Sequence, residues 1–191
     1  MSETIVFNTE DTLKGVDYVR NESIAKFALV GENHPILREI LPDFDFENPP
    51  VNPNEFASSL VETCKENKGL GLSANQCGFK HRVFVMGHGD DYVAFFNPRI
   101  TEKYDECHML EGCLSFPLLG LRITRPSAID VEYQDFQGKP QKAHFTGISA
   151  RCFQHELDHM NGIVYTDRVK SLALQTGIQK RNKMMRKLRL K

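Results

Sequence analysis

Residues 146–162, TGISARCFQHELDHMNG, hold the pattern that decides the fold. Thr146-Gly147 can open a helix, and Asn161-Gly162 is a natural terminator at its other end. Inside this helix, His155-Glu156-Leu157-Asp158-His159 places two imidazoles four residues apart, on one face and beside a carboxylate. The stretch therefore predicts a helix that presents a cluster of ionisable groups along one side.

This HExxH motif suits a metal site, because two imidazoles can bind one cation while Glu156 moves a proton between water and a leaving amine. Cys152, Phe153 and Met160 are apolar neighbours of the motif, which indicates that the helix is buried. A buried His-Glu-His cluster without partners is costly. Two histidines at helical spacing also occur without a metal, so the motif favours a metal site without proving one.

A catalytic zinc site generally has three protein ligands, so a third ligand is needed. In many HExxH proteases it is a downstream His or Glu, but no Glu follows Glu156 and no His follows His159. Asp158 and Asp167 remain downstream, and Cys113 is an upstream candidate in a glycine-containing segment. Because a lone cysteine is more often a small buried hydrophobe, these candidates stay open at this point.

A first helix is indicated upstream, where Asn52 can act as the N-cap and Pro53 suits the first turn. Apolar residues then recur at three- and four-residue steps as far as Cys64, and Gly69 is a plausible stop. Residues 1–33 are polar and weakly patterned, so we interpret them as an extension or as a loosely packed lead-in.

Short strands follow this first helix. Arg82–Met86 and Tyr92–Phe96 are rich in Val, Phe and Tyr and flank a glycine-containing loop, which predicts a hairpin. Ala128–Tyr133 alternates in the same way, and a turn leads from it to Gln141–Phe145. Strands in runs followed by helices predict one α+β domain over residues 1–191, with antiparallel β-sheets packed around the central HExxH helix.

The composition is that of a globular protein, with 40% apolar and 26% charged residues in a chain of 191. No apolar run approaches the ~20 residues of a membrane-spanning helix, and the N-terminus lacks a signal-peptide pattern, so we expect no membrane association and a cytoplasmic location. The five cysteines are odd in number and show no paired spacing, which argues against a disulfide framework.

The C-terminal segment 175–191 is strongly basic. Residues Gln175 to Leu190 could form a helix with Ile178, Met185 and Leu188 on one side, and Lys180–Lys191 holds seven Lys or Arg and no acid. Such a face attracts polyanions through salt-sensitive phosphate contacts. A solvated tail explains the composition equally well.

Three ordered motifs carry a resemblance to a known family. GLGLSANQ at 69–76, EGCLS at 111–115 and QHELDH at 154–159 resemble the signature motifs of peptide deformylases. Three ordered motifs are far less probable by chance than one, and the resemblance extends over roughly 34–165. It implies a metal-dependent hydrolase that removes the formyl group from the N-terminal formyl-methionine of nascent polypeptides and releases formate.

The resemblance also implies roles for individual residues. Cys113, His155 and His159 would bind the metal, and Glu156 would be the acid/base. The side-chain amide of Gln76 and the backbone N–H of Leu114 would stabilise the oxyanion. The implied substrate contacts are made by the backbone of Gly71 and by Leu70, Glu111, Ile148 and Cys152.

Some residues depart from the family pattern. Arg151 stands where an aliphatic residue is expected, and it would narrow or polarise the rim of the pocket. Ser73 and Asn75 replace residues that are commonly Ala and Thr or another small residue. Because these two changes conserve size, they do not threaten the implied chemistry.

The implied cofactor is one divalent metal ion, with Fe(II) expected in the cell and Zn(II), Ni(II) or Co(II) as alternatives in purified protein. The implied partners are formyl-methionyl nascent peptides and the ribosome, contacted through the basic C-terminal segment, and we expect a monomer. Two other interpretations compete: an endopeptidase with Asp167 as the third ligand, and a ribosome- or RNA-binding protein with a structural metal site. The second would need a fourth ligand, for which the sequence offers no convincing candidate.

Overall fold

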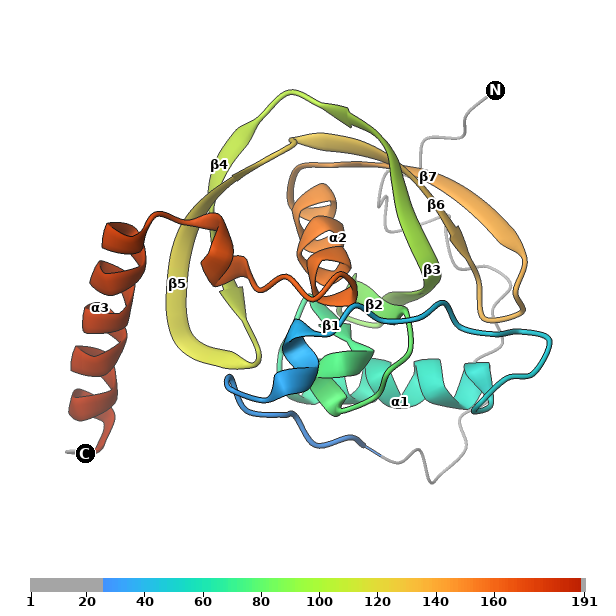
Figure 1. The fold of residues 1–191 in the computed structure, drawn as a ribbon, viewed down its shortest axis with the longest axis horizontal. Coiled ribbons are helices and arrows are strands. Elements are labelled where there is room, and N and C mark those ends of the chain that lie inside the picture. Colours follow the sequence, from blue (N-terminus) through green and yellow to red (C-terminus); the bar gives the residue numbers. More distant parts are fainter. Residues whose placement is uncertain (1–25, 190–191) are drawn as a thin grey trace.

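The structure is a computed structural model in which residues 26–189 are described. Helix α2 (Gly147–Met160) lies at the centre, with curved β-strands around it and helix α1 (Pro53–Glu66) crossing beside it (Figure 1). The bounds of α2 agree with those predicted from its glycine-flanked sequence. The predicted α+β class, with antiparallel sheets around the HExxH helix, is confirmed.

The larger sheet has five strands in the order β1-β2-β3-β6-β7, and every neighbouring pair is antiparallel. Its strands are β1 (Gly71–Ser73), β2 (Val83–His88), β3 (Asp91–Tyr104), β6 (Ala128–Gln134) and β7 (Pro140–Thr146). Strands β2 and β3 form the predicted hairpin, with His88 opposite Asp91 across a two-residue turn. The predicted strands at 128–133 and 141–145 are also confirmed, as the pair β6 and β7.

A second, two-stranded sheet consists of β4 (Cys107–Cys113) and β5 (Phe116–Arg125). Sequence analysis did not identify these strands. Exposed positions alternate in β4 with buried or partly buried ones, but the sequence hides this pattern because Leu110 is exposed and Glu111 is buried. The turn between the strands brings Cys113 opposite Phe116.

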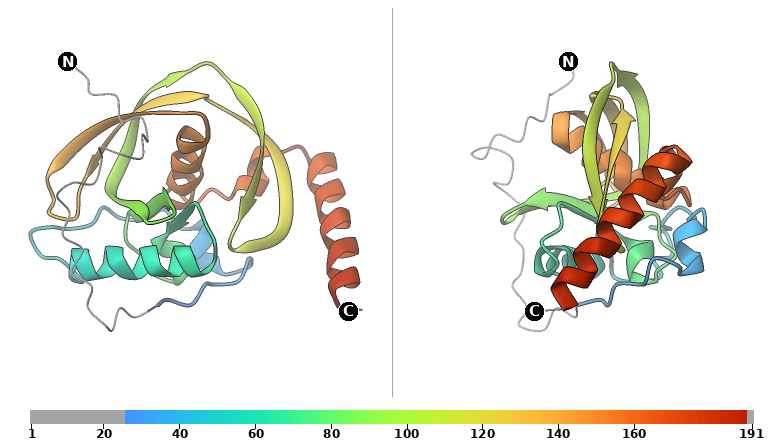
Figure 2. Two further views of the ribbon diagram at one scale, coloured as in Figure 1. Left: turned by 180° about the vertical axis from the view of Figure 1, so that it is seen from behind. Right: turned by 90° about the vertical axis from the view of Figure 1, so that its left-hand side faces the viewer.

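The helix ends follow the local sequence. The Asn52 side chain accepts hydrogen bonds from the backbone N–H groups of Asn54 and Glu55, as its predicted N-cap role requires. Helix α1 ends at Glu66, three residues before the predicted stop at Gly69. A third helix, α3 (Ser171–Arg189), starts four residues earlier than predicted and runs along β5 (Figure 2).

Only part of the predicted apolar side of α3 packs on the protein. Ile178 packs against the apolar cluster that includes Leu121 and Ile123 of β5, whereas Leu188 is exposed. The reason is geometric: the straight helix extends past the end of β5 (Figure 1). No helix within residues 26–189 is long and apolar enough to cross a membrane.

The predicted extension 1–33 is partly incorrect. Its first 25 residues lie outside the described region, but residues 26–33 belong to the fold. Phe27 packs on Phe56 and Phe79, with ring centroids 5.5 and 4.6 Å away, and the backbone N–H of Val30 donates to the carbonyl of Gln76. The apolar side chains of Phe27 and Leu29 and these backbone hydrogen bonds therefore hold residues 26–33 against the protein.

Candidate metal centre and active site

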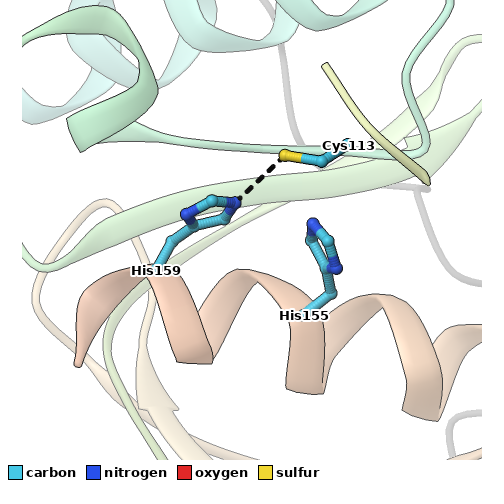
Figure 3. A group of neighbouring side chains, drawn as sticks. All are labelled: Cys113, His155 and His159. Atoms are coloured by element: carbon cyan, nitrogen blue, oxygen red, sulfur yellow. Dashed lines mark hydrogen bonds between the residues drawn. The ribbon is translucent and has the colours of Figure 1, made fainter. Parts of the chain in front are cut away.

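Three candidate metal ligands converge from two elements (Figure 3). His155 and His159 lie one turn apart on α2, and Cys113 at the end of β4 faces them from the opposite side. Their ligand atoms all lie within 4.8 Å of one another, and Cys113 Sγ is 3.4 Å from His159 Nε2. The structure thus brings the three residues of the predicted ligand set together.

Glu111 orients the first imidazole. Its Oε2 lies 3.1 Å from His155 Nδ1, which leaves Nε2 as the nitrogen that faces the centre. Burial lowers the pKa of His155, but Cys113 and Glu111 outweigh it and raise this pKa to about 10. Burial and the neighbouring charge of His155 hold the pKa of His159 well below its usual value. The two imidazoles are therefore electrostatically distinct.

Two arginines hold Glu111 in turn. Arg125 donates to both carboxylate oxygens at 2.7 and 2.9 Å, and Arg151 donates to Oε1 at 2.5 Å. Burial raises the pKa of Glu111, but hydrogen bonds from His155 and Arg125 outweigh this and keep it well below its usual range. Glu111 lines the cleft, yet its carboxylate is fully engaged, so its predicted contact with substrate stays a prediction.

Arg151 does not present its charge at the rim. The residue is 3% exposed, and besides Glu111 its guanidinium donates to the carbonyls of Ile123 and Cys107 at 2.9 and 2.6 Å. The expectation of a polarised rim is therefore wrong, because the guanidinium is paired with Glu111 and hydrogen-bonded to these two carbonyls inside the protein. The Arg151 side chain extends from α2 and contacts both strands of the smaller sheet.

Asp158 and Asp167, the two other acids considered as metal ligands, are hydrogen-bonded elsewhere in the structure. Asp158 accepts a 2.7 Å hydrogen bond from Arg125 and two further ones from Arg168. Asp167 accepts from Arg38 and, at 3.1 Å, from the backbone N–H of Val164. Within the described region neither belongs to the cluster of possible ligands, which removes the support for an endopeptidase with Asp167 at the metal.

Sequence analysis gave no role to Arg125, although a signal was present. In β5 the buried positions alternate, and Arg125 has the same parity as Leu121 and Ile123. An arginine on the buried face of a strand needs a buried anion as partner. That parity could have indicated an ion pair beneath the sheet.

Glu156 lies beside the ligands and is almost fully buried. Burial raises the pKa of this carboxyl group, and the Ser73 hydroxyl donates a hydrogen bond to its Oε2. The approach of β1 is so close that a Cβ on Gly71 would lie 2.5 Å from Glu156 Oε1 and 2.8 Å from Cys152 Sγ. Only glycine therefore fits at position 71. Ser73, which was expected only to conserve the size of the residue, also donates a hydrogen bond to Glu156.

Gln76 points its amide nitrogen at the same centre. Its Oε1 accepts a 3.0 Å hydrogen bond from the backbone N–H of Ser73, so Nε2 faces Cys113 Sγ at 3.3 Å and Ser115 Oγ at 3.2 Å. Asn75, the next departure from the motif, donates at 2.8 Å to the carbonyl of His159. The short 3-10 helix Ala74–Cys77 therefore positions a donor and supports the end of α2.

A cleft of about 760 Å³ contains this arrangement. Every predicted site residue except His159 lines it, and His159 is 1% exposed beside Cys113. The set that lines the cleft is Leu70, Gly71, Gln76, Glu111, Cys113, Leu114, Ile148, Cys152, His155 and Glu156.

Comparison with known proteins identifies the family. The family model described as polypeptide deformylase matches residues 26–175. This chain belongs to the peptide deformylase family. Deformylases are metalloenzymes that remove the N-terminal formyl group from nascent peptides. The peptide deformylase of Finegoldia magna is 39% identical over 145 residues, which cover 74% of this chain and 88% of that protein.

Solved deformylase structures share the fold. The crystal structure of peptide deformylase from Thermotoga maritima is 35% identical with a TM-score of 0.71, and the match covers 76% of this chain and 99% of that one. A Met-Ala-Ser-bound class I type b peptide deformylase from Acinetobacter baumannii is 27% identical with a TM-score of 0.73, covering 77% and 100%. The family recognised from three motifs is thus confirmed by sequence and by structure.

Proposed function

We propose that this chain hydrolyses the formyl amide of N-terminal formyl-methionine on nascent polypeptides and releases formate. The observation that carries this proposal is the convergence of the Cys113 thiol and two imidazoles beside the buried carboxylate of Glu156. Cys113, His155 and Glu156 line a cleft that is open to solvent and large enough for a peptide terminus.

Cys113, His155 and His159 fit a single divalent cation. Their mutual distances suit ligands on one ion, and the Glu111 hydrogen bond directs the free nitrogen of His155 inward. Such a cation, when bound, polarises a carbonyl oxygen and makes hydroxide available near neutral pH. One thiolate among two imidazoles is a soft donor set, so we propose Fe(II) in the cell, with Zn(II), Ni(II) or Co(II) as alternatives in purified protein.

Glu156 would carry the proton. Its carboxylate takes a proton from the attacking water and passes it to the amine nitrogen that leaves with methionine. Burial raises its pKa towards the range in which a carboxyl group can both accept and donate near neutral pH. The Ser73 hydroxyl holds one carboxylate oxygen, so the other, beside Gly71, is directed at the cleft.

Two donors would stabilise the formyl oxygen as negative charge develops on it. We assign these to the Gln76 amide, which the Ser73 N–H holds in a fixed orientation, and to the backbone N–H of Leu114. Removing one donor of this kind costs roughly 2.7–4 kcal/mol of transition-state stabilisation. A preorganised amide needs no rearrangement during the reaction.

The substrate backbone would bind beside β1. In the described sheet β1 is an edge strand, so an extended peptide can add alongside Gly71. Leu70, Ile148 and Cys152 offer an apolar wall for the methionine side chain. Since a formyl carbon bears only hydrogen, a narrow site admits it and excludes acetyl and peptide carbonyls.

The test is formate release from formyl-Met-Ala-Ser compared with its acetylated analogue. We expect release from the formyl peptide only, and a loss of about 10²–10⁴-fold in Glu156→Gln with the metal content retained. Glu106→Gln, a change at an exposed position, is the matched control and should keep full activity. Hydrolysis of both peptides at equal rates, or an active Glu156→Gln enzyme, would contradict the proposal.

The metal assignment has a separate test. An Fe(II)–thiolate site should lose activity in air or dilute peroxide, whereas the Ni(II) form should keep it. Metal analysis accompanies both time courses. Equal lifetimes for the two forms would count against iron.

We further propose that α3 contacts the ribosome near emerging chains and that the chain acts in the cytoplasm as a monomer. Lys180, Lys183 and Lys187 are exposed on α3, and they can contact phosphates. A truncated chain that ends before Lys180 should no longer co-sediment with ribosomes at low salt. Unchanged co-sedimentation would rule out this contact.

A further inference from the structure

The backbone at Gly69 is held from behind the cleft by two side chains. Its carbonyl oxygen accepts a 2.6 Å hydrogen bond from the Tyr92 hydroxyl of β3 and a 3.3 Å hydrogen bond from the Cys64 thiol of α1. Its N–H donates at 2.9 Å to the carbonyl of Cys64. Because Gly69 lies outside the paired residues Gly71–Ser73, these bonds hold it and the sheet ladder does not.

The two donors are buried, whereas the backbone that they hold lines the cleft. Tyr92 is 4% exposed and Cys64 is fully buried, and neither lines the cleft, although Gly69 and Gly71 do. Burial raises the pKa of Tyr92, so its hydroxyl stays protonated and can donate over the whole working range of the enzyme. A buried hydroxyl needs a partner, and here that partner is a backbone atom of the cleft wall.

The segment that starts at Gly69 touches two groups of the catalytic site. A Cβ on Gly69 would be 2.8 Å from Leu114 Cδ1 and 3.0 Å from Cys64 Sγ. Two residues further, a Cβ on Gly71 would be 2.5 Å from Glu156 Oε1. With so little free space on either side, the position of residues 69–71 is set to within a few tenths of an ångström.

We propose that Tyr92 is a positioning residue for the substrate-binding edge of β1 and that Cys64 assists it. The hydroxyl fixes the Gly69 carbonyl and so holds residues 69–71 in place before the substrate arrives. This inference rests on the proposed function, in which the substrate backbone adds alongside Gly71. An edge strand that is ordered in advance pays less conformational entropy when an extended peptide pairs with it.

The test is the kinetics of Tyr92→Phe, which removes the hydroxyl and keeps the ring. We expect KM for formyl-Met-Ala-Ser to rise about 10-fold, equivalent to about 1.4 kcal/mol. The value of kcat should stay within about twofold, because the contacts of β1 with the substrate backbone are made equally before and during the reaction.

A shorter substrate separates positioning from a general structural role. Formyl-methionine amide has almost no backbone beyond the reacting residue to lie along β1, so its KM should rise less than about threefold in Tyr92→Phe. A variant that was merely less folded would instead lose kcat for both substrates alike.

Two further variants complete the design. Tyr133→Phe is the matched control: this tyrosine lies on β6 of the same sheet, packs on Phe95 at 4.6 Å and is outside the cleft, so both constants should keep their wild-type values. Cys64→Ala removes the weaker thiol donor, and KM for the tripeptide should rise less than in Tyr92→Phe, again with a smaller change for the amide.

An unchanged KM for formyl-Met-Ala-Ser in Tyr92→Phe would overturn the inference, as would an equal rise for both substrates. If Tyr92→Phe does not fold, as judged by circular dichroism, Cys64→Ala is judged by the same two criteria. Failure of the wild-type enzyme to release formate from either substrate would refute the proposed function itself. The two failures are therefore distinguishable.

Discussion

Helices α2 and α3 both carry many charged side chains, but they place them in opposite environments. In α2, His155, Glu156 and Asp158 are buried, and each has a hydrogen-bond partner from another element. In α3, Lys183 and Lys187 are exposed to solvent. Titratable side chains thus build a buried, hydrogen-bonded site on one helix and a solvated face on the other.

The difference shows where polar residues constrain a protein. A buried charge is tolerable only with a partner, so the α2 groups recruit Glu111 and Arg125 from the smaller sheet. Breaking such a pair on one side typically costs about 3–5 kcal/mol, whereas exposed pairs are worth about 0–1 kcal/mol. Changes on the α2 side should therefore have large effects and changes on α3 small ones.

The largest effect is expected for Cys113→Ala. Loss of the thiolate should abolish metal retention after dialysis and reduce formate release to background, since two imidazoles alone bind weakly. Cys107→Ala, at the other end of β4, is the control and should keep both. Full metal content and activity in Cys113→Ala would show that the ligand assignment is wrong.

Next is Arg125→Met, which leaves Glu111 and Asp158 without their shared cation. We expect the free energy of unfolding, measured with urea on the metal-free protein, to fall by about 3–5 kcal/mol. Arg186→Met on α3 should change it by less than about 0.5 kcal/mol. Similar effects of the two substitutions would remove the contrast between the helices.

A smaller effect should appear in acid. The pKa of Glu111 is lowered in the folded protein, so its contribution to stability is present above about pH 4.3 and is lost as the pH falls towards the folded value. For one ion-paired carboxylate the loss is on the order of 2 kcal/mol. Unfolding curves of the metal-free protein between pH 5 and 2.5 should be steeper in pH for wild type than for Glu111→Gln. If stability falls with pH equally in wild type and Glu111→Gln, this pH dependence does not come from Glu111.

The smallest change in stability is expected for the double substitution Lys183→Gln with Lys187→Gln. Because both side chains are exposed, the free energy of unfolding should change by less than about 0.5 kcal/mol. Ribosome co-sedimentation should nevertheless weaken, and its log–log salt slope should fall by about two. A destabilised variant would show that the cations of α3 are more than a solvated face.

The features that could be predicted from the sequence were those encoded by residues close together in the chain. The HExxH spacing, the Asn52 N-cap and the hairpin before Phe96 depend on residues close together in the chain, and all three are observed. The smaller sheet was missed because β4 lacks a regular alternation of apolar residues. Its contribution to the site could be inferred only through the Cys113 motif.

By itself, the sequence determined the family, the central helix and the set of residues that meet in the cleft, because short motifs and helical spacing carry that information. Only the tertiary structure decided the partners of those residues: the two arginines on Glu111 and the hydroxyl of Ser73 on Glu156. These contacts join residues between 14 and 83 positions apart in the sequence. No local pattern encodes such a meeting, because it depends on how separate elements pack and on the need of each buried charge for a partner.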